Sequence, residues 1–405
     1  MKPLSFCLIT TFYPPHHFGG DAIFVERLAA ALTGDGHSVE VIYDSDAFNR
    51  TGAAPRSSDH LAAAVVEDIG RGAIGRMDLL AVHQLGRPVL KQREIHRLLS
   101  ERKFDVVHFH NVSLLGGPAI LGEGTGVRLC TLHDYWFVCA MHVLWRYERE
   151  ACTKRTCIRC TLRGGRPVQW WRYGGSARRQ EETVDAFITG SQFSKAAHIA
   201  NGFHGPIEVI PHFVPDHEPP SEAPQRSEPI RPFVLYAGRL ERLKGIADLV
   251  RFFRTYRNID LLIAGSGSLE DELRGEIREL GHVRLLGWRN ETELRALYAQ
   301  ALAAVVPSLC YETFGLSAAE AFSNGAPAVM RDIGALTELA GGGALLYRTD
   351  SDLEAHLEML RSDPTVRDRL GQAARDQYER EFAAEIHLRK YYALIERVAS
   401  KSRTS

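Results

Sequence analysis

Two glutamates, Glu312 and Glu320, lie eight positions apart in the segment PSLCYETFGLSAAEA, residues 307–321. The apolar run 303–306 before this segment predicts a strand, and the alanine-rich stretch that starts near Gly315 predicts a helix. A strand–loop–helix points free backbone N–H groups and the positive end of a helix dipole at one place, which suits a phosphate. One glutamate could hold a sugar hydroxyl and the other a ribose hydroxyl, although the spacing also fits an ordinary loop with a solvated Glu312.

A second segment, GRLERLKG at residues 238–245, follows a predicted strand at 233–237 and leads into a helix that starts near Ile246. The guanidinium of Arg239 can grip two phosphate oxygens, and Lys244 adds a compact positive charge. Gly238 lets the backbone approach a ligand closely. Taken alone, such residues are also common on a solvated rim, so the two segments carry weight only together.

Together the two segments resemble those of the retaining glycosyltransferases of family 4, and the resemblance covers most of the chain. It implies the α/β GT-B fold, in which two Rossmann-like domains face across a cleft, and a nucleotide diphosphate sugar as the donor substrate. Arg239 and Lys244 would hold the donor diphosphate, and Glu320 would hold the ribose. Glu312 would hold the transferred sugar and the distal phosphate together with the backbone of Thr313, Phe314, Gly315 and Leu316.

The resemblance also assigns residues elsewhere in the chain. Gly19 and Gly20 match the glycine pair that approaches the donor phosphates, and His133 matches a histidine near the anomeric carbon. Arg289 falls where the nucleobase pocket usually lies. Gly265 keeps the first glycine of the family turn Gly-Asp-Gly-Pro, which is Gly265-Ser266-Gly267-Ser268 here and has lost the acid and the proline. His108 and His110 share one face of the preceding strand, where packing is favoured over a place in the cleft.

No Asp-x-Asp motif stands at the expected donor site, so donor binding is expected to need no divalent metal. The resemblance implies front-face attack by the acceptor, with the departing phosphate accepting the proton.

Four of the seven cysteines, Cys139, Cys152, Cys157 and Cys160, form the pattern C-x₁₂-C-x₄-C-x₂-C. Four thiolates can hold a tetrahedral zinc ion or an iron–sulfur cluster, and the spacing does not choose between these and free thiols. The other three, Cys7, Cys130 and Cys310, lie on apolar segments and are expected to be buried.

The cysteines belong to a basic, aromatic insertion, residues 139–179. Residues 142–179 hold ten Lys or Arg against two Glu, interleaved with tryptophan and tyrosine. This composition suits a phosphate-bearing acceptor or a membrane interface. It would also suit single-stranded nucleic acid, a poorer fit beside a sugar-nucleotide site, and it is compatible with a merely solvated insertion.

The whole chain has 405 residues, 45% hydrophobic and 24% charged, with 49 Lys and Arg against 50 Asp and Glu. The length allows two α/β domains, and the net charge of −1 gives no nucleic-acid signature. No apolar run reaches the roughly 18 residues that span a bilayer. Residues 4–10 are typical of a strand and not of a signal peptide, so we expect a cytoplasmic protein, peripheral at the inner membrane face if its acceptor is a lipid.

Apolar runs interrupted by a Pro- and charge-rich stretch divide the chain into residues 1–214, a linker at 215–231 and residues 232–383. The resemblance implies that the first of these is the acceptor domain and the last the donor domain. By analogy with GT-B proteins, a helix at 384–405 should cross back to the first domain. Strands are expected at 4–10, 39–43, 106–110, 128–132, 187–189 and 207–210, and then at 233–237, 261–264, 283–286, 303–306 and 328–330. Helices are expected at 22–32 and 87–101, and residues 45–60 are expected to form a loop.

The leading hypothesis is a retaining glycosyltransferase of glycan, glycolipid or polysaccharide biosynthesis that acts on a lipid-linked or nascent glycan. Two alternatives are a sugar-nucleotide epimerase and a metal-bearing binding protein on a degenerate GT-B scaffold.

Overall fold

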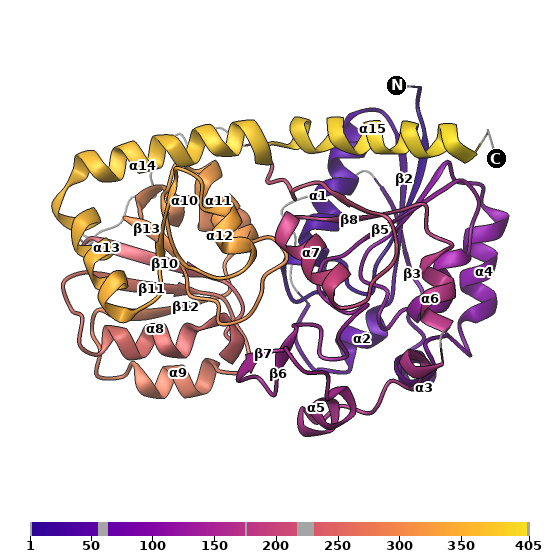
Figure 1. The fold of residues 1–405 in the computed structure, drawn as a ribbon, viewed down its shortest axis with the longest axis horizontal. Coiled ribbons are helices and arrows are strands. Elements are labelled where there is room, and N and C mark those ends of the chain that lie inside the picture. Colours follow the sequence, from indigo (N-terminus) through magenta and orange to yellow (C-terminus); the bar gives the residue numbers. More distant parts are fainter. Residues whose placement is uncertain (1, 56–63, 175, 217–230, 403–405) are drawn as a thin grey trace. The chain divides into compact units, whose positions relative to one another are not determined.

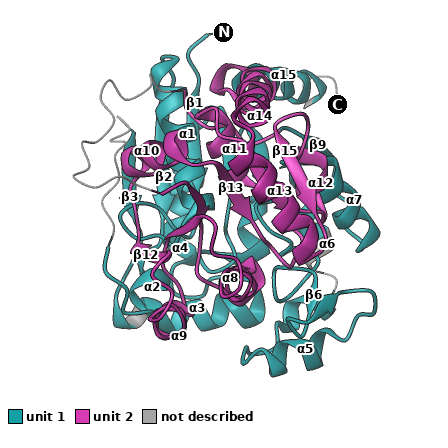
Figure 2. Cartoon of the chain, turned by 90° about the vertical axis from the view of Figure 1, so that its left-hand side faces the viewer, with its two compact units in different colours: residues 1–210, 388–405 teal, residues 211–387 magenta. Residues whose placement is uncertain are grey.

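Two parallel β-sheets organise the chain, one in each of two units (Figures 1 and 2). The structure, a computed structural model, describes residues 2–55, 64–174, 176–216 and 231–402. Unit 1 comprises residues 1–210 and 388–405, and unit 2 comprises residues 211–387. Most of the predicted linker, residues 217–230, lies outside the described residues.

The sheet of unit 1 has the strand order β3-β2-β1-β4-β5-β8-β9, and all its neighbouring strands are parallel. Its central strands are short apolar runs with nearly every side chain buried, because helices cover both faces of such a sheet. The strands are β1 (Ser5–Ile9), β2 (Ser38–Tyr43), β3 (Val65–Asp68), β4 (Val106–Phe109), β5 (Val127–Thr131), β8 (Ala186–Thr189) and β9 (Ile207–Val209). A separate antiparallel pair, β6 (Trp145–Arg146) and β7 (Glu150–Ala151), lies in the insertion.

The helices of unit 1 lie between these strands. They are α1 (Gly20–Gly34), α2 (Ser45–Asn49), α3 (Ala73–Leu85), α4 (Gln92–Glu101), α5 (Cys157–Arg163), α6 (Ser176–Glu181) and α7 (Gln192–Ala200), with the 3₁₀ turns η1 (Gly117–Gly122) and η2 (Trp170–Tyr173).

Two secondary-structure predictions for unit 1 are wrong, one at the start of residues 45–60 and one at the start of residues 87–101. Residues 45–60 were expected to be a loop, but α2 forms at Ser45–Asn49 because the Asp44 carboxylate caps its first turn. Residues 56–60 of this prediction lie outside the described residues. The helix expected at 87–101 begins only at Gln92, because Asp78 accepts the backbone N–H groups of Val89 and Leu90 at 2.7 and 2.8 Å.

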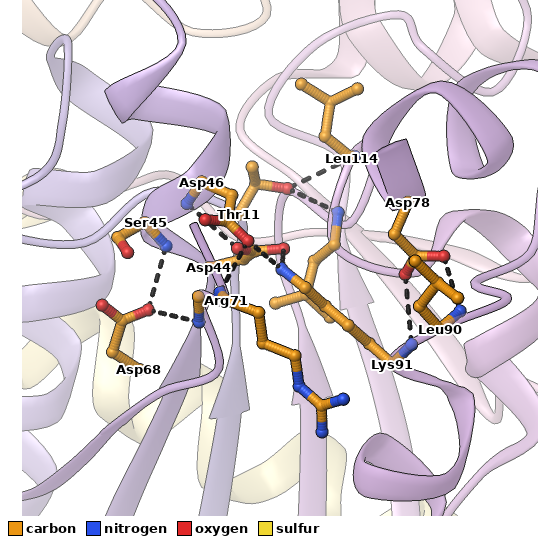
Figure 3. A network of polar contacts seen from close by, with 12 residues as sticks. Thr11, Asp44, Ser45, Asp46, Asp68, Arg71, Asp78, Leu90, Lys91 and Leu114 are labelled. Carbon is orange, nitrogen blue, oxygen red and sulfur yellow. Dashed lines mark hydrogen bonds and ion pairs between the residues drawn. The ribbon is translucent and has the colours of Figure 1, made fainter. Parts of the chain in front are cut away.

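A buried ion-pair network ties these elements together (Figure 3). The Nζ atom of Lys91 lies 2.6 Å from a carboxylate oxygen of both Asp44 and Asp46, and all three side chains are 1% exposed. Asp46 also accepts the backbone N–H groups of Arg71 and Gly72. Burial raises the pKa of Asp44 to about 6 despite the nearby lysine. The network therefore fixes the loops that follow β2 and β3.

The sheet of unit 2 has the strand order β12-β11-β10-β13-β14-β15 and is also parallel throughout. Its strands are β10 (Phe233–Ala237), β11 (Asp260–Ala264), β12 (Val283–Gly287), β13 (Ala303–Val306), β14 (Ala328–Arg331) and β15 (Ala344–Tyr347). Its helical segments are η3 (Arg242–Lys244), α8 (Ile246–Phe253), α9 (Glu270–Glu276), α10 (Glu291–Gln300), α11 (Leu316–Ser323), α12 (Ala335–Leu339), α13 (Asp350–Ser362), α14 (Pro364–Gln377) and the π-helical η4 (Tyr378–Phe382). The sequence prediction lacked β15, an edge strand of four residues.

The last helix, α15 (Ala384–Ser402), belongs to unit 1 from Leu388 onward. The Tyr391 side chain is fully buried there, and its hydroxyl lies 2.9 Å from Nδ1 of His108 on β4. Tyr392 donates to the carboxylate of Asp35 at 2.7 Å. No helix among the described residues is both long and apolar enough to cross a membrane.

Candidate active site

Three loops at the carboxyl ends of the unit 2 strands are bonded to one another. Leu240, after β10, donates its backbone N–H to the carbonyl of Ser266, after β11, at 3.0 Å. Leu309, after β13, donates to the carbonyl of Leu243 at 2.8 Å. Ligands of open parallel sheets bind at this end of the strands. The predicted basic and acidic segments are therefore brought together here.

Glycines make this close approach of the loops possible. Gly245 has φ 74°, and a Cβ atom on it would lie 1.9 Å from the carbonyl oxygen of Pro307. Gly265 has φ 143°, and a Cβ atom there would lie 1.9 Å from the carbonyl oxygen of Gly238. Any other residue would push the loops apart.

Lys244 and Glu312 form the centre of the site. The Lys244 Nζ atom lies 2.7 and 2.9 Å from the two carboxylate oxygens of Glu312, and Ser308 donates its hydroxyl to the same carboxylate at 2.5 Å. The side chains of Lys244 and Glu312 are 27% and 18% exposed. Burial by itself raises the pKa of Glu312, but Lys244, Ser308 and Arg239 together hold it below its ordinary value. Glu312 is therefore a carboxylate at neutral pH and accepts hydrogen bonds only.

Arg239 leaves most of its guanidinium open to solvent. The side chain is 53% exposed, and its nearest acid is Glu241 at 3.5 Å. Tyr236 donates its buried hydroxyl to the Arg239 carbonyl at 2.6 Å, which fixes the backbone beneath the side chain. The positive charge of Arg239 lowers the pKa of Glu312, so the guanidinium contributes to the electrostatic potential at the Glu312 carboxylate.

Helix α11 begins directly after Gly315, which has φ 121°. Thr313 precedes the helix, Leu316 is its first residue, and Phe314 is buried in the core below. Glu320 lies within the helix with its side chain partly exposed. The structure thus places Glu312 before the helix and Glu320 inside it, as the sequence pattern predicts.

The loop after β12 adjoins the same edge, because Gly265 donates its backbone N–H to the carbonyl of Gly287 at 2.8 Å. Arg289 in this loop is 34% exposed and lies 3.8 Å from the Glu293 carboxylate. The two predicted donor residues Gly265 and Arg289 therefore lie on adjacent loops.

In unit 1 a second group of predicted residues surrounds the start of α1. Gly19 precedes the helix with φ 146°, and Gly20 is its first residue. Asn111 donates its side-chain amide to the Asp21 carboxylate at 2.9 Å. The negative charge of Asp21 also acts on the imidazole of His133. Phe24 on the same helix contacts the His133 ring, so the helix that begins with the glycine pair lies beside this histidine.

His133 follows β5 and has a defined contact on each side. Its Nε2 lies 3.0 Å from Nδ1 of His110, and the Phe24 ring meets it edge-on with centroids 5.5 Å apart. Burial lowers the pKa of His133, so the imidazole is neutral at pH 7. His108 and His110 are buried, as the packing interpretation expects, but His110 also touches the candidate residue.

Sequence reasoning missed Ser308, which holds Glu312, and Asn111, which holds Asp21. Ser308 and Asn111 are the second residues after the ends of β13 and β4, and this position was the available signal.

The four insertion cysteines are partly buried, and their mutual charges raise the pKa values of Cys152 and Cys157 beyond the effect of burial. Among the residues that the structure describes, no three His, Cys, Asp or Glu side chains are arranged to hold a metal ion. The structure therefore does not support the predicted zinc or iron–sulfur site. Cys7, Cys130 and Cys310 are buried, as predicted.

The two parallel sheets are those of a GT-B protein, and comparisons with known proteins agree. The family model "Glycosyltransferase Family 4" matches residues 18–218, and "Glycosyl transferases group 1" matches residues 220–377. The chain belongs to the family 4 glycosyltransferases and is an enzyme of sugar transfer.

Relatives and solved structures match nearly end to end. A glycogen synthase of Mycobacterium tuberculosis is 28% identical over 405 residues, covering 93% of this chain and 90% of the relative. A D-inositol 3-phosphate glycosyltransferase of Arthrobacter is 26% identical and covers 95% and 92%. Sucrose-phosphate synthase from Thermosynechococcus elongatus has a TM-score of 0.70 at 20% identity over 98% of this chain and 100% of that one. The catalytic domain of starch synthase IV from Arabidopsis thaliana, bound to ADP and acarbose, has a TM-score of 0.69 at 16% identity, covering 98% and 100%.

Proposed function

We propose that the protein is a retaining glycosyltransferase whose unit 2 loops bind the nucleotide diphosphate of the donor and whose unit 1 residues serve the sugar and the acceptor. The observation that carries the donor site is the Lys244–Glu312 pair beside the open guanidinium of Arg239, directly before helix α11. Two cations that could bind a diphosphate therefore lie beside a carboxylate that could bind sugar hydroxyls. The starch synthase relative bound to ADP supports a nucleotide diphosphate as the ligand class.

The residues would divide the binding as follows. Arg239 and Lys244 hold the diphosphate, and Gly238 and Gly265 allow it to approach the backbone. Glu312 accepts hydrogen bonds from hydroxyls of the transferred sugar, and the backbone N–H groups of residues 313–316 meet the distal phosphate at the start of α11. Glu320 accepts from the ribose hydroxyls, and Arg289 borders the nucleobase.

The chemical step balances without a protein nucleophile. The acceptor oxygen forms a bond to the anomeric carbon on the face from which the bond to the phosphate oxygen breaks, so the configuration is retained. The electron pair of the broken bond stays on the diphosphate, and the acceptor proton passes to the departing phosphate oxygen. Lys244 and Arg239 stabilise the charge that grows on this oxygen, the contribution that usually matters most in such steps.

For unit 1 we propose that the Gly19–Gly20 turn and His133 contact the donor phosphates and the sugar. His110 is a positioning residue for His133, because the 3.0 Å contact between their ring nitrogens leaves one tautomer of the pair favoured. The acceptor is proposed to be a lipid-linked or growing glycan, and the name of the glycogen synthase relative supports a growing glycan. Such an acceptor would place the protein in the cytoplasm at the inner membrane face.

The cysteine-rich insertion, residues 139–179, is proposed to be the element that distinguishes this chain's acceptor side. The support for a structural metal in it is the C-x₂-C spacing of the sequence. Its role would be to order the insertion and not to bind the donor.

A panel of nucleotide sugars, incubated with pure protein, tests the function. Slow release of nucleotide diphosphate from one donor, faster with a glycan acceptor, is the expected result. Interconversion of sugars would indicate the epimerase instead. Absence of both reactions, together with nucleotide-sugar binding, would indicate a binding protein. The same panel should be run with Lys244→Met, which removes the proposed diphosphate lysine. Lys103→Met is the matched control, since Lys103 is exposed and far along the chain from the site.

A further inference from the structure

One edge of unit 1 concentrates the exposed apolar side chains of the chain. Of the twelve large apolar or aromatic side chains that stand out as exposed in the described residues, nine fall in residues 77–90 and 158–173. These residues belong to α3, the segment after it, α5 and η2. Figures 1 and 2 both show α3 and α5 along the same lower edge of unit 1. We call this region the α3–α5 surface.

Helix α3 contributes an outward apolar stripe. Asp78, Leu79 and Val82 face inward and are buried, whereas Met77 and Leu80 point away from the unit, with Met77 71% exposed. Leu85 ends the helix, and Val89 and Leu90 continue the stripe beyond it. Asp78 fixes that continuation by accepting the N–H groups of Val89 and Leu90. The apolar side chains are thus held outward by a rigid support.

The 3₁₀ turn η2 presents two aromatic rings in the same way. Trp171 is buried and donates its indole N–H to the His83 carbonyl at the end of α3, 3.2 Å away. A 3₁₀ helix has three residues per turn, so Trp170 and Tyr173 share the opposite side. They are 58% and 54% exposed. Trp171 therefore joins η2 to α3 and leaves the other two rings outside.

Helix α5 completes the surface. Ile158 and Leu162 are one turn apart and both exposed, with Leu162 at 60%. Gln169, in the segment between α5 and η2, places its side-chain nitrogen 3.2 Å from Nε2 of His83 on α3. The segment after helix α5 therefore adjoins the end of α3.

The charge of the same residues has one sign. Residues 151–180 contain no Asp or Glu, and the only acid in residues 69–93 is the buried Asp78. Exposed cations around the apolar side chains include Arg76, Arg87, Arg159 and Arg163. Aliphatic and aromatic side chains inside a cationic rim match the boundary between acyl chains and anionic headgroups.

We propose that the α3–α5 surface docks unit 1 on an anionic lipid bilayer. This inference rests on the membrane contact proposed above and names the residues that would make it. Lipid binding does not depend on any step of sugar transfer, so the two can be tested separately. A second copy of the chain is a poor occupant, because a two-fold interface would set the same cations against each other. Single-stranded nucleic acid would use the two aromatic rings but gain little from the aliphatic stripe of α3.

The test uses the full chain and vesicles of phosphatidylcholine with or without phosphatidylglycerol. We expect cosedimentation with the phosphatidylglycerol vesicles, loss of binding at about 0.5 M salt, and a blue shift of tryptophan emission that the Trp170→Phe variant reduces. The double variant Arg159→Glu with Arg163→Glu should weaken binding at least about 25-fold, because each arginine lost from the anionic surface weakens binding about fivefold. Leu80→Ser with Leu162→Ser should weaken it at least about tenfold.

Matched controls are Ile199→Ser, an exposed apolar residue on α7, and Arg278→Glu, an exposed cation of unit 2, which should both bind like the parent chain. All variants should keep the parent melting temperature and donor hydrolysis. Equal binding by the controls and the surface variants would overturn the proposal, as would no binding at low salt. Tighter binding to single-stranded nucleic acid than to the vesicles, or a dimer that the charge reversals dissolve, would overturn it too.

Discussion

Replacing Lys244 by methionine tests the candidate donor site most directly, because the change keeps an unbranched side chain of similar length and removes its charge. In the structure this ammonium group lies 2.7 and 2.9 Å from the two oxygens of the Glu312 carboxylate. Lys244→Met therefore has two separable effects. It removes a cation from the proposed diphosphate site, and it leaves Glu312 without its main partner.

The effect on transfer should be large. Loss of one charged contact to a departing phosphate costs about 3 kcal/mol, which lowers kcat/KM roughly a hundredfold. The effect on folding should be smaller. The two side chains are 27% and 18% exposed, so the pair lies between an exposed and a buried ion pair, and we expect a loss of about 1–2 kcal/mol in the free energy of unfolding.

The assays are kcat/KM for donor turnover and urea unfolding, with Lys103→Met as the control and Glu312→Gln added to Lys244→Met. The double variant has no unpaired carboxylate, so it should regain most of the lost stability and none of the lost activity. Turnover by Lys244→Met within about threefold of the parent chain would refute the diphosphate role. Recovery of activity in the double variant would show that the single variant fails through misfolding.

Four further predictions address other parts of the chain. Glu320→Ala should raise the Kd for the nucleoside diphosphate about tenfold with little change in melting temperature, which calorimetry can measure. If the insertion holds a metal, pure protein should contain about one zinc or iron–sulfur equivalent by elemental analysis, and Cys157→Ser with Cys160→Ser should lose it. Lys91→Met should lower the free energy of unfolding by about 3–5 kcal/mol, because it leaves two buried carboxylates unpaired, and denaturant titration measures this. Burial and nearby cations lower the pKa of His83 to about 4, so unfolding takes up a proton as the pH falls from 6.5 to 4. The parent chain should lose about 1–2 kcal/mol of stability over this range, because solvent screens a partly exposed group, and His83→Gln should reduce the loss.

The sequence predicted those parts of the fold that follow from local pattern. Apolar runs bounded by turns, such as residues 233–237 and 303–306, are strands as expected, and the motif residues after them meet in space. This worked because the carboxyl ends of neighbouring parallel strands share an edge, so residues distant in sequence become neighbours once the topology is known.

The rest depended on contacts that no local pattern encodes. Helix α2 depends on the Asp44 cap and on Lys91, which lies 47 residues further along the chain. The segment before α4 is held out of the helix by Asp78. The contact between His110 and His133 joins two strand ends and could not be read from either strand alone.

The return of α15 to unit 1 has a consequence for synthesis on the ribosome. Unit 2 is a continuous stretch of chain, whereas unit 1 lacks its final helix until residues 388–402 have emerged. Tyr391, whose hydroxyl contacts His108 beneath the His110–His133 pair, is made about 280 residues after those strands. At ~5–20 residues per second this is a delay of roughly 15–55 s. Throughout that interval His108 on β4 lacks its contact with Tyr391, so we expect a nascent chain to need a chaperone most for the half that it makes first.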